Sequence, residues 1–306
     1  MIGKNASNPL NGVRRAIPFA SARRAFRAVL QAAGAGGKVL LPAYIGWSPK
    51  EGSGVFDPVR ELGLEFRFYA LDERLRIDLN SLGAELARGD VRVLVLIHYF
   101  GRVDPRYTDA VRLGRERGAF IVEDEAHAMF SDLVGGICGR LGDAAIYSFH
   151  KLLPVESGGA LVLNEAAIAW AARIKAPAGE MAAAQFDLHR IAEIRRTNWR
   201  LVDGLIRESG AEMEPLFSSL AAGEIPQSYP VLIRHGSRDD LYRRMNAAGF
   251  GVVSLYHTLI AAIDPQRFPE SARTSRLILN LPVHQDAAEG DLVDLVDELA
   301  CAAATG

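Results

Sequence analysis

The sequence has little cysteine and little lysine, and each shortage narrows what the protein can be. Its 306 residues include two cysteines, Cys138 and Cys301, which form no C-x-x-C pair and no metal-binding spacing. This favours a reduced, cytoplasmic protein with two buried cysteines, and we expect no metal. Only five of the 35 basic residues are lysines, so the lysine at position 151 needs an explanation.

The sequence also lacks a strong net charge and long apolar runs. Its formal net charge is −2 with both signs spread along the chain, so we expect neither nucleic acid nor a membrane surface as a partner. No run approaches 18 apolar residues, which predicts no transmembrane helix, and residues 1–19 lack the apolar core of a signal peptide. A hydrophobic fraction of 49% is typical of a globular protein with a substantial core.

The first half of the sequence alternates strand-like and helix-like segments, which predicts an α/β fold. Such alternation indicates a mostly parallel sheet with helices on both faces, and such sheets bind ligands beyond the carboxyl ends of their strands. This rule directs attention to His98, to Asp124 and to residues 147–157. The strand-like segments are 38–43, 65–71, 91–101, 119–124, 143–149 and 158–164, and the helix-like ones are 22–34, 81–89 and 105–118.

The pattern changes after about residue 165. Two long helical stretches are followed by shorter elements, which predicts a smaller α+β domain. We therefore divide the chain into a large domain over residues 1–185 and a small C-terminal domain over residues 186–306. The helical stretches are 166–174 and 188–210, the shorter elements are 228–233, 238–252 and 276–283, and a closing helix covers 288–304.

The segment Ser148-Phe149-His150-Lys151 is the first candidate for chemistry. A lysine at a strand end in a cleft loses solvation, which lowers its pKa and makes its amine a better nucleophile. Such a lysine can form a Schiff base with an aldehyde cofactor, and Ser148 could donate a hydrogen bond to a phosphate. Taken alone, an S-x-x-K is more often an exposed loop, so the motif needs support from elsewhere.

That support is the segment FIVEDEAHA. Asp124 closes an apolar strand, where its carboxylate can keep the pyridine nitrogen of pyridoxal phosphate protonated. His127, three residues later, could reach the phenolic oxygen of the same ring. A helix N-cap is an equally common role for an aspartate that follows a strand.

A helix start at residues 18–26 offers a phosphate site. Ser21, Ala22 and Arg23 could present backbone N–H groups and a hydroxyl at the positive end of that helix, although a plain serine N-cap is the simpler interpretation. Tyr44 and Trp47 are candidates to stack on a cofactor ring, with core packing as the alternative. The sequence contains no dinucleotide fingerprint, H-E-x-x-H pair or G-x-S-x-G elbow that would compete.

In this order along the chain, the motifs resemble the fold-type I pyridoxal-phosphate enzymes. More narrowly, the sequence is similar to the DegT/DnrJ/EryC1/StrS family of sugar aminotransferases. The similar segments are LPAY (41–44), IHYFG (97–101), IVEDEAHA (121–128), GRLGDAAIYSFHK (139–151), SGGALVL (157–163) and LNLPVH (279–284). The resemblance extends over about residues 18 to 300.

The resemblance implies a role for each central residue. Lys151 would be the Schiff-base lysine, Asp124 the partner of the pyridine nitrogen, His127 the group near the phenolic oxygen, and Ser148 a phosphate ligand. Some relatives carry a histidine in place of the lysine and act as dehydratases, so Lys151 favours amino transfer. The implied reaction moves an amino group from an amino acid, with glutamate as the expected donor, to a keto sugar that can be nucleotide-linked.

Other functions stay open at this point. The same cofactor could serve a lyase or decarboxylase, or the amination of a cyclitol, a keto acid or another non-sugar ketone. A non-catalytic regulator that binds the cofactor is a third possibility. The resemblance also implies a homodimer, and Tyr256, His257 and Arg276 are candidates for the substrate side of the cleft.

Overall fold

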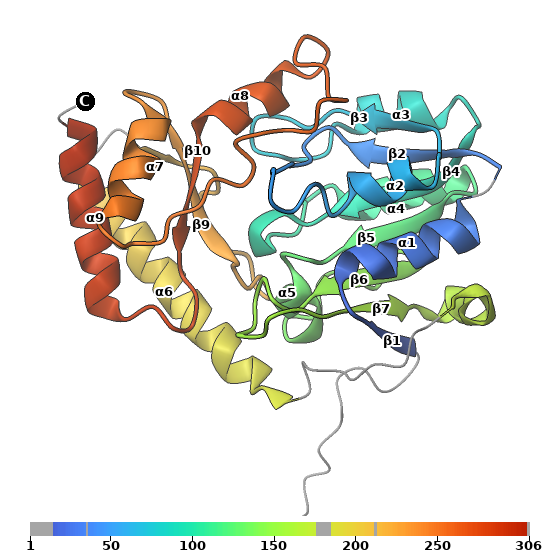
Figure 1. Ribbon diagram of the computed structural model, residues 1–306, viewed down its shortest axis with the longest axis horizontal. Helices are drawn as coiled ribbons and strands as arrows, with labels where there is room; N and C mark the ends of the chain where they lie inside the picture. Colours follow the sequence, from blue (N-terminus) through green and yellow to red (C-terminus); the bar gives the residue numbers. More distant parts are fainter. Residues whose placement is uncertain (1–14, 35, 176–184, 211–212, 305–306) are drawn as a thin grey trace, which may run out of the picture.

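The computed structural model describes residues 15–34, 36–175, 185–210 and 213–304. Within these residues the chain forms a large sheet and a small sheet, each with its own helices (Figure 1). No helix of this described part is long and apolar enough to cross a membrane. The expectation about a signal peptide falls mainly on residues 1–14, which lie outside the described residues.

The large sheet has seven strands in the order β1-β7-β6-β5-β4-β2-β3. From β3 to β6 all neighbours are parallel, whereas β7 runs antiparallel to both β6 and β1. This confirms the predicted α/β fold with a mostly parallel sheet. The strands are β1 (Arg15–Phe19), β2 (Lys38–Pro42), β3 (Phe66–Tyr69), β4 (Val91–Ile97), β5 (Phe120–Asp124), β6 (Ala144–Ser148) and β7 (Gly159–Leu163).

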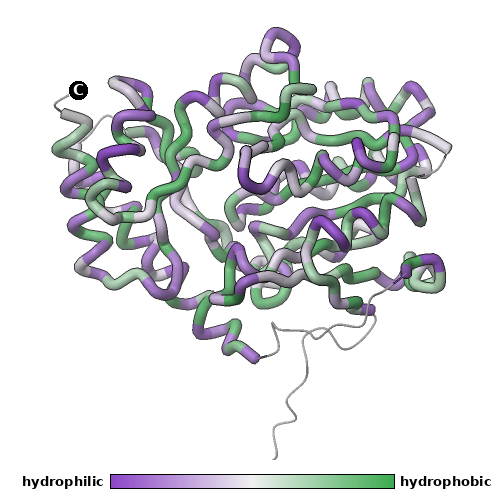
Figure 2. The backbone as a smooth tube through the Cα atoms, in the orientation of Figure 1, coloured by the Kyte–Doolittle hydropathy of each residue, from purple (hydrophilic) through white to green (hydrophobic). Residues whose placement is uncertain are grey.

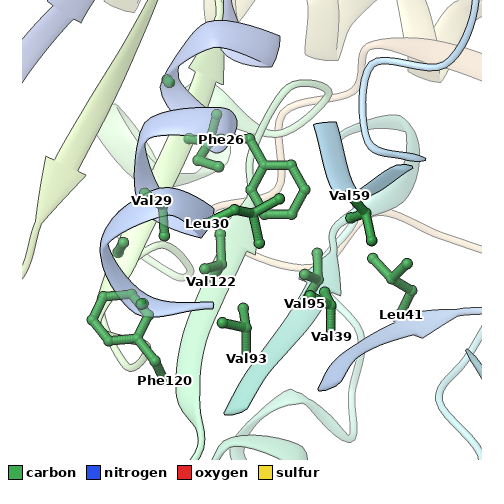
Figure 3. Packing of buried hydrophobic residues seen from close by; sticks show 14 of the residues in the cluster. Phe26, Val29, Leu30, Val39, Leu41, Val59, Val93, Val95, Phe120 and Val122 are labelled. Carbon is green, nitrogen blue, oxygen red and sulfur yellow. The ribbon is translucent and has the colours of Figure 1, made fainter. Parts of the chain in front are cut away.

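Helices cover both faces of this sheet because its central strands are apolar on both sides. On one face, Phe26 and Leu30 of α1 pack over Val93 and Val122 of β4 and β5 (Figure 3). Hydrophobic residues accordingly gather along the central strands in Figure 2. The helices of this part are α1 (Ala22–Ala33), α2 (Phe56–Glu61), α3 (Leu79–Leu86), α4 (Tyr107–Glu116), α5 (Met129–Leu133) and the 3₁₀ helices η1 (Tyr99–Gly101) and η2 (Glu165–Arg173).

The second part is built on a three-stranded antiparallel sheet in the order β10-β9-β8, and it has a hydrophobic core of its own. Figure 1 shows it beside the carboxyl ends of the large sheet's parallel strands. The division at residues 185 and 186 stays a prediction. The elements are α6 (Leu188–Glu208), β8 (Met213–Pro215), β9 (Ser228–Ile233), α7 (Arg238–Ala247), α8 (Pro269–Leu277), β10 (Ile278–Pro282) and α9 (Glu289–Ala304).

Several expectations are wrong in detail. Residues 166–173 lie in the 3₁₀ helix η2 and not in a long α-helix, and Ile174 is its C-cap. The element expected at 276–283 divides between α8, which ends at Leu277, and strand β10, which begins at Ile278. Cys138 is buried as expected, but Cys301 is exposed. The buried stripe of α9 consists of Leu292, Leu295, Val296, Leu299 and Ala302, and Cys301 falls outside this helical spacing.

Candidate active site

The candidate catalytic residues lie at the carboxyl edge of the parallel strands. Asp124 is the last residue of β5 and Ser148 the last residue of β6, and these two strands are paired in parallel. Lys151 follows in a turn in which the backbone N–H groups of Leu152 and Leu153 donate to the carbonyl of Phe149. The strand ends therefore bring together the residues that the sequence motifs single out.

Lys151 points its amine at His127. The Nζ atom of Lys151 lies 3.1 Å from Nε2 of His127, and Lys151 is only partly exposed. Burial lowers the pKa of Lys151, against the opposing attraction of the Asp124 carboxylate and then of Glu51. A lower pKa raises the fraction of neutral amine at neutral pH, which is the nucleophilic form.

His127 is a buried, neutral imidazole. Burial lowers its pKa well below the ordinary value, and the charge of Lys151 lowers it further. The backbone N–H of Phe100 donates to Nδ1 over 3.4 Å, which leaves the proton on Nε2. The ring of Phe100 stacks on the imidazole with centroids 5.7 Å apart. The geometry therefore fixes His127 as a donor toward the amine of Lys151.

Asp124 interacts electrostatically with Lys151 from the neighbouring strand. Burial raises the pKa of its carboxyl group, while the charge of Lys151 lowers it. One carboxylate oxygen accepts the backbone N–H of Ala126 at 2.9 Å, so Asp124 stabilises a local turn. It is not a helix N-cap, since α5 begins only after Ala128.

The start of α1 meets the start of β7. Ser21 is the N-cap of α1, and its hydroxyl accepts the N–H of Arg24 at 3.3 Å. Ser21 also bridges to Gly158, while Gly159 pairs with Ser148 across β6 and β7. A Cβ at Gly159 would lie 2.5 Å from the nitrogen of Ala22, so only glycine allows this approach. Both serines therefore lie near the positive end of α1.

These residues fit pyridoxal phosphate. The phosphate needs an anion site, which the first N–H groups of the twelve-residue helix α1 and the hydroxyls of Ser21 and Ser148 can supply. The ring nitrogen needs a carboxylate, and the aldehyde needs a weakly basic amine, which match Asp124 and Lys151. The tight approach at Gly159 keeps the two halves of this anion site together.

The remaining predicted cofactor residues differ in their burial and in their contacts. Tyr44 is fully buried, and its hydroxyl donates to the carbonyl of Leu255 and accepts the N–H of Tyr256. Trp47 is 44% exposed, so the alternative of core packing is wrong for it. A stacking role for either ring stays a prediction. Arg23 donates to the backbone carbonyl of Glu51.

Of the three substrate-side candidates, Tyr256 has a direct contact with His127. Its hydroxyl lies 3.4 Å from Nε2 of His127. His257 and Arg276 are exposed, and a substrate role for either stays a prediction. Gly46 makes room for this tyrosine, since a Cβ there would lie 2.0 Å from the Tyr256 ring.

The sequence analysis missed two residues around Lys151. Glu51 comes from an exposed loop between β2 and α2, and its charge acts on Lys151. Phe100 stacks on His127 and donates to it with a backbone φ of 59°, which is unusual for a bulky residue. Spacing along the chain carries no signal for either residue, because both act through tertiary contacts.

Known structures share this fold. The DegT DnrJ EryC1 StrS aminotransferase from Brucella abortus superposes with a TM-score of 0.75 at 18% identity, and the PLP form of Spr1654 from Streptococcus pneumoniae with 0.78 at 16%. Each match covers 95% of this chain and 87% of the other. These similarities show the fold and confirm the expected fold-type I architecture.

Sequence comparison gives the family. The chain is 24% identical over 156 residues to the UDP-4-amino-4,6-dideoxy-N-acetyl-beta-L-altrosamine transaminase of Campylobacter jejuni. This match spans 50% of the chain and 40% of that transaminase, which is less than half of its length. Residues 7–203, well over half of this chain, match one described family throughout. The chain belongs to the DegT/DnrJ/EryC1/StrS aminotransferase family.

Proposed function

We propose that the protein is a pyridoxal-phosphate-dependent aminotransferase that moves an amino group from an amino acid to a keto sugar. The observation that carries this proposal is the contact of 3.1 Å between the amine of Lys151 and His127, with Asp124 acting on the same amine. A structural or regulatory site would not require His127 and Asp124 to lie around a lysine whose pKa is lowered.

The chain's own residues divide the work. When bound, pyridoxal phosphate supplies an aldehyde for the amino group and a ring that accepts electrons. Lys151 holds the cofactor and, with its lowered pKa, can accept and return a proton through Nζ. His127 donates from Nε2 and orients the amine, while Asp124 keeps a proton on the ring nitrogen. Ser21, Ser148 and the start of α1 bind the phosphate.

For the acceptor, we propose a nucleotide-linked keto sugar, with glutamate as the amino donor. The name of the Campylobacter jejuni relative describes the transamination of a UDP-linked sugar, and the family membership supports the same substrate class here. We further propose a cytoplasmic homodimer, as the family resemblance of the sequence implies, and Trp47, which is 44% exposed, is a candidate for its interface. Light scattering should then give twice the chain mass of 33.2 kDa, whereas a monomeric mass with cofactor bound would contradict the dimer.

The first experiment tests the lysine. Wild type mixed with pyridoxal phosphate should give a visible absorption band, and borohydride should then attach the cofactor covalently to the peptide that contains Lys151. The variant Lys151→Ala should lose both signals. Lys50→Ala, which removes a lysine from an exposed loop, should keep both. An unchanged band and attachment in Lys151→Ala would refute the central assignment.

A second experiment tests the substrate class. Protein loaded with cofactor is mixed with glutamate and with UDP- or TDP-linked keto sugars, and 2-oxoglutarate release is measured. Keto acids and cyclitol ketones form the comparison set. Glutamate alone can release at most one equivalent per chain, so we expect release well beyond one equivalent with at least one nucleotide-linked sugar. Release only with the comparison set would move the function to a non-sugar ketone, and no reaction with any amino donor would favour the regulatory alternative.

A further inference from the structure

A buried cluster of four ionisable residues lies behind Asp124. Side chains alternate along a strand, so Glu123 points away from the face that Asp124 uses. Glu123 and Glu125 flank Asp124, and they meet His98 from the end of β4 and Cys138 from the loop after α5. All four side chains are at most 1% exposed. The proposed aminotransferase chemistry uses none of them.

The spacing of the cluster is that of metal ligands. Nε2 of His98 lies 3.5 Å from Oε1 of Glu125 and 3.3 Å from Oε2 of Glu123, and Sγ of Cys138 lies 3.2 Å from Oε2 of Glu125. One ligand atom each from His98, Glu125 and Cys138 all lie within 4.8 Å of one another. Tetrahedral zinc, with bonds of about 2.0–2.3 Å, requires ligand atoms roughly 3.3–3.8 Å apart. Reaching that geometry from a spacing of up to 4.8 Å would take side-chain movements of up to about one ångström.

Hydrogen bonds within the protein leave this cluster incomplete. Among the residues that the structure describes, neither Nδ1 of His98 nor Oε1 of Glu125 has a hydrogen-bond partner. Each belongs to a fully buried side chain, where a polar atom without a partner is costly. Three acidic groups also surround one imidazole, so fully ionised ligands would leave an excess of negative charge in the interior. A dication between them would remove most of that excess.

Glu123 is held differently from the other three residues. Its two carboxylate oxygens accept the backbone N–H groups of Gly139 and Gly142, each over 2.6 Å. These bonds fold the loop around residue 138 over the end of β5, and they place the thiol next to Glu125. Glu123 therefore positions the loop, and its Oε2 lies 3.3 Å from Nε2 of His98.

Against the expectation of no metal from the cysteine spacing, we propose that His98, Glu125 and Cys138 bind a divalent transition metal ion of the zinc class. One imidazole, one thiolate and carboxylate oxygens form a donor set that suits Zn²⁺ better than Mg²⁺ or Ca²⁺, which prefer oxygen alone. The ion would tie the ends of β4 and β5 to the loop at residue 138, directly behind Asp124. It would have a structural role, because its ligands are inaccessible to a substrate.

The experiment measures metal content and a thiolate signature. Full-length protein without a histidine tag is produced in medium containing Zn²⁺ or, separately, Co²⁺, dialysed against a chelator, and analysed by elemental mass spectrometry. Wild type should retain about one ion per chain. Its cobalt form should show an absorption band from thiolate-to-cobalt charge transfer. Cys138→Ser should lose the band and lower the metal content at least fivefold, whereas Cys301→Ser, which changes the exposed cysteine, should preserve both.

Two further variants keep the outcome decisive. If Cys138→Ser fails to fold, Cys301→Ser decides the question alone. Cys138 is the only cysteine of that variant, so a thiolate band must come from Cys138, and the absence of a band would contradict the site. Lys151→Ala should keep the metal even if it loses the cofactor, which separates this proposal from the proposed function. Less than a tenth of an ion per chain in wild type, or a full complement in Cys138→Ser, would overturn the site.

Discussion

Lys151 and Lys38 are two lysines whose surroundings shift the pKa of the amine in opposite directions. Lys38 forms ion pairs with Glu65 and Asp90 at 3.1 and 3.4 Å, and its hydrogen bond to Glu65 raises its pKa. Burial lowers the pKa of Lys151, and the nearby Asp124 offsets this only in part. The two amines therefore lose their protons in different pH ranges, with Lys151 becoming neutral first.

We predict that this order is visible in chemical modification. Cofactor-free protein is treated with a small amine reagent over a range of pH, and the rate at each lysine is followed by peptide mass spectrometry. Only the neutral amine reacts, so the rate at Lys151 should level off at a lower pH than the rate at Lys38. The shape of each profile is compared and not its height, because access differs between the two sites. Coincident profiles would contradict the lowered pKa.

For single residues, the sequence predicts the site residues that follow the ends of strands. It does not predict the site residues that reach the site through tertiary contacts. Asp124 and Lys151 could be placed because apolar strands stop just before them. The sequence could not single out Tyr256 among its three substrate-side candidates. Tyr256 lies 105 positions after Lys151 and contacts His127 only because the small part of the fold places it there. Phe100 and Glu51 had no pattern at all.

Among the elements, α1 makes a close backbone contact with the start of β7. Its first turn, the proposed phosphate end of the site, lies against the start of β7, where Gly159 faces the backbone of Ala22 and Tyr147. The helix was predictable from its spacing and closing glycine, and β7 from its apolar run. Their contact was not predictable, because it joins segments more than 130 residues apart.

We predict that Gly159→Ala separates the two elements. A Cβ there would meet backbone atoms at 2.5 and 2.6 Å, which cannot rotate away. We expect a loss of about 1–3 kcal/mol in the free energy of unfolding, measured with urea, and at least tenfold weaker binding of pyridoxal phosphate. Gly204→Ala is the control, because nothing lies within 4 Å of its new Cβ and alanine favours its helix α6. Equal effects of both substitutions would refute this interpretation.

On the scale of the whole molecule, one buried arginine joins the lysine turn to the small part of the fold. Arg195 of α6 is 2% exposed, and burial lowers its pKa to about 10. Its guanidinium donates to the carbonyls of Leu152 and Gln227 over 3.1 Å each and to the side chain of Gln285 over 3.0 Å. One side chain thus connects the residue after Lys151 to β9 and to the loop before α9.

We predict that Arg195→Met lowers the free energy of unfolding by about 2–4 kcal/mol, because it leaves buried carbonyl groups without donors. Arg207→Met on the same helix should cost less than about 1 kcal/mol, since Arg207 pairs with Asp203 at the surface. Both values come from urea titrations followed by circular dichroism. A loss at Arg195 no larger than the loss at Arg207 would show that the buried contacts contribute little.

The parallel strands of the seven-stranded sheet were predictable from the sequence, but the pairing of β1 with β7 was not. The alternation of segments predicts the parallel strands, whereas β1 pairs with β7 across almost 150 residues, and no local signal announces this pairing. Such long-range pairing forms slowly, because a large loop must close before the contact contributes.

The same pairing has a consequence for biosynthesis. The ribosome makes residues 21–23 early, yet the proposed phosphate-binding turn also contacts residues 158 and 159, which emerge much later. A nascent chain shorter than about 160 residues therefore has the first half of the cofactor site without the second. If the proposed phosphate site is correct, loading with cofactor must wait until β7 has left the exit tunnel and paired with β1.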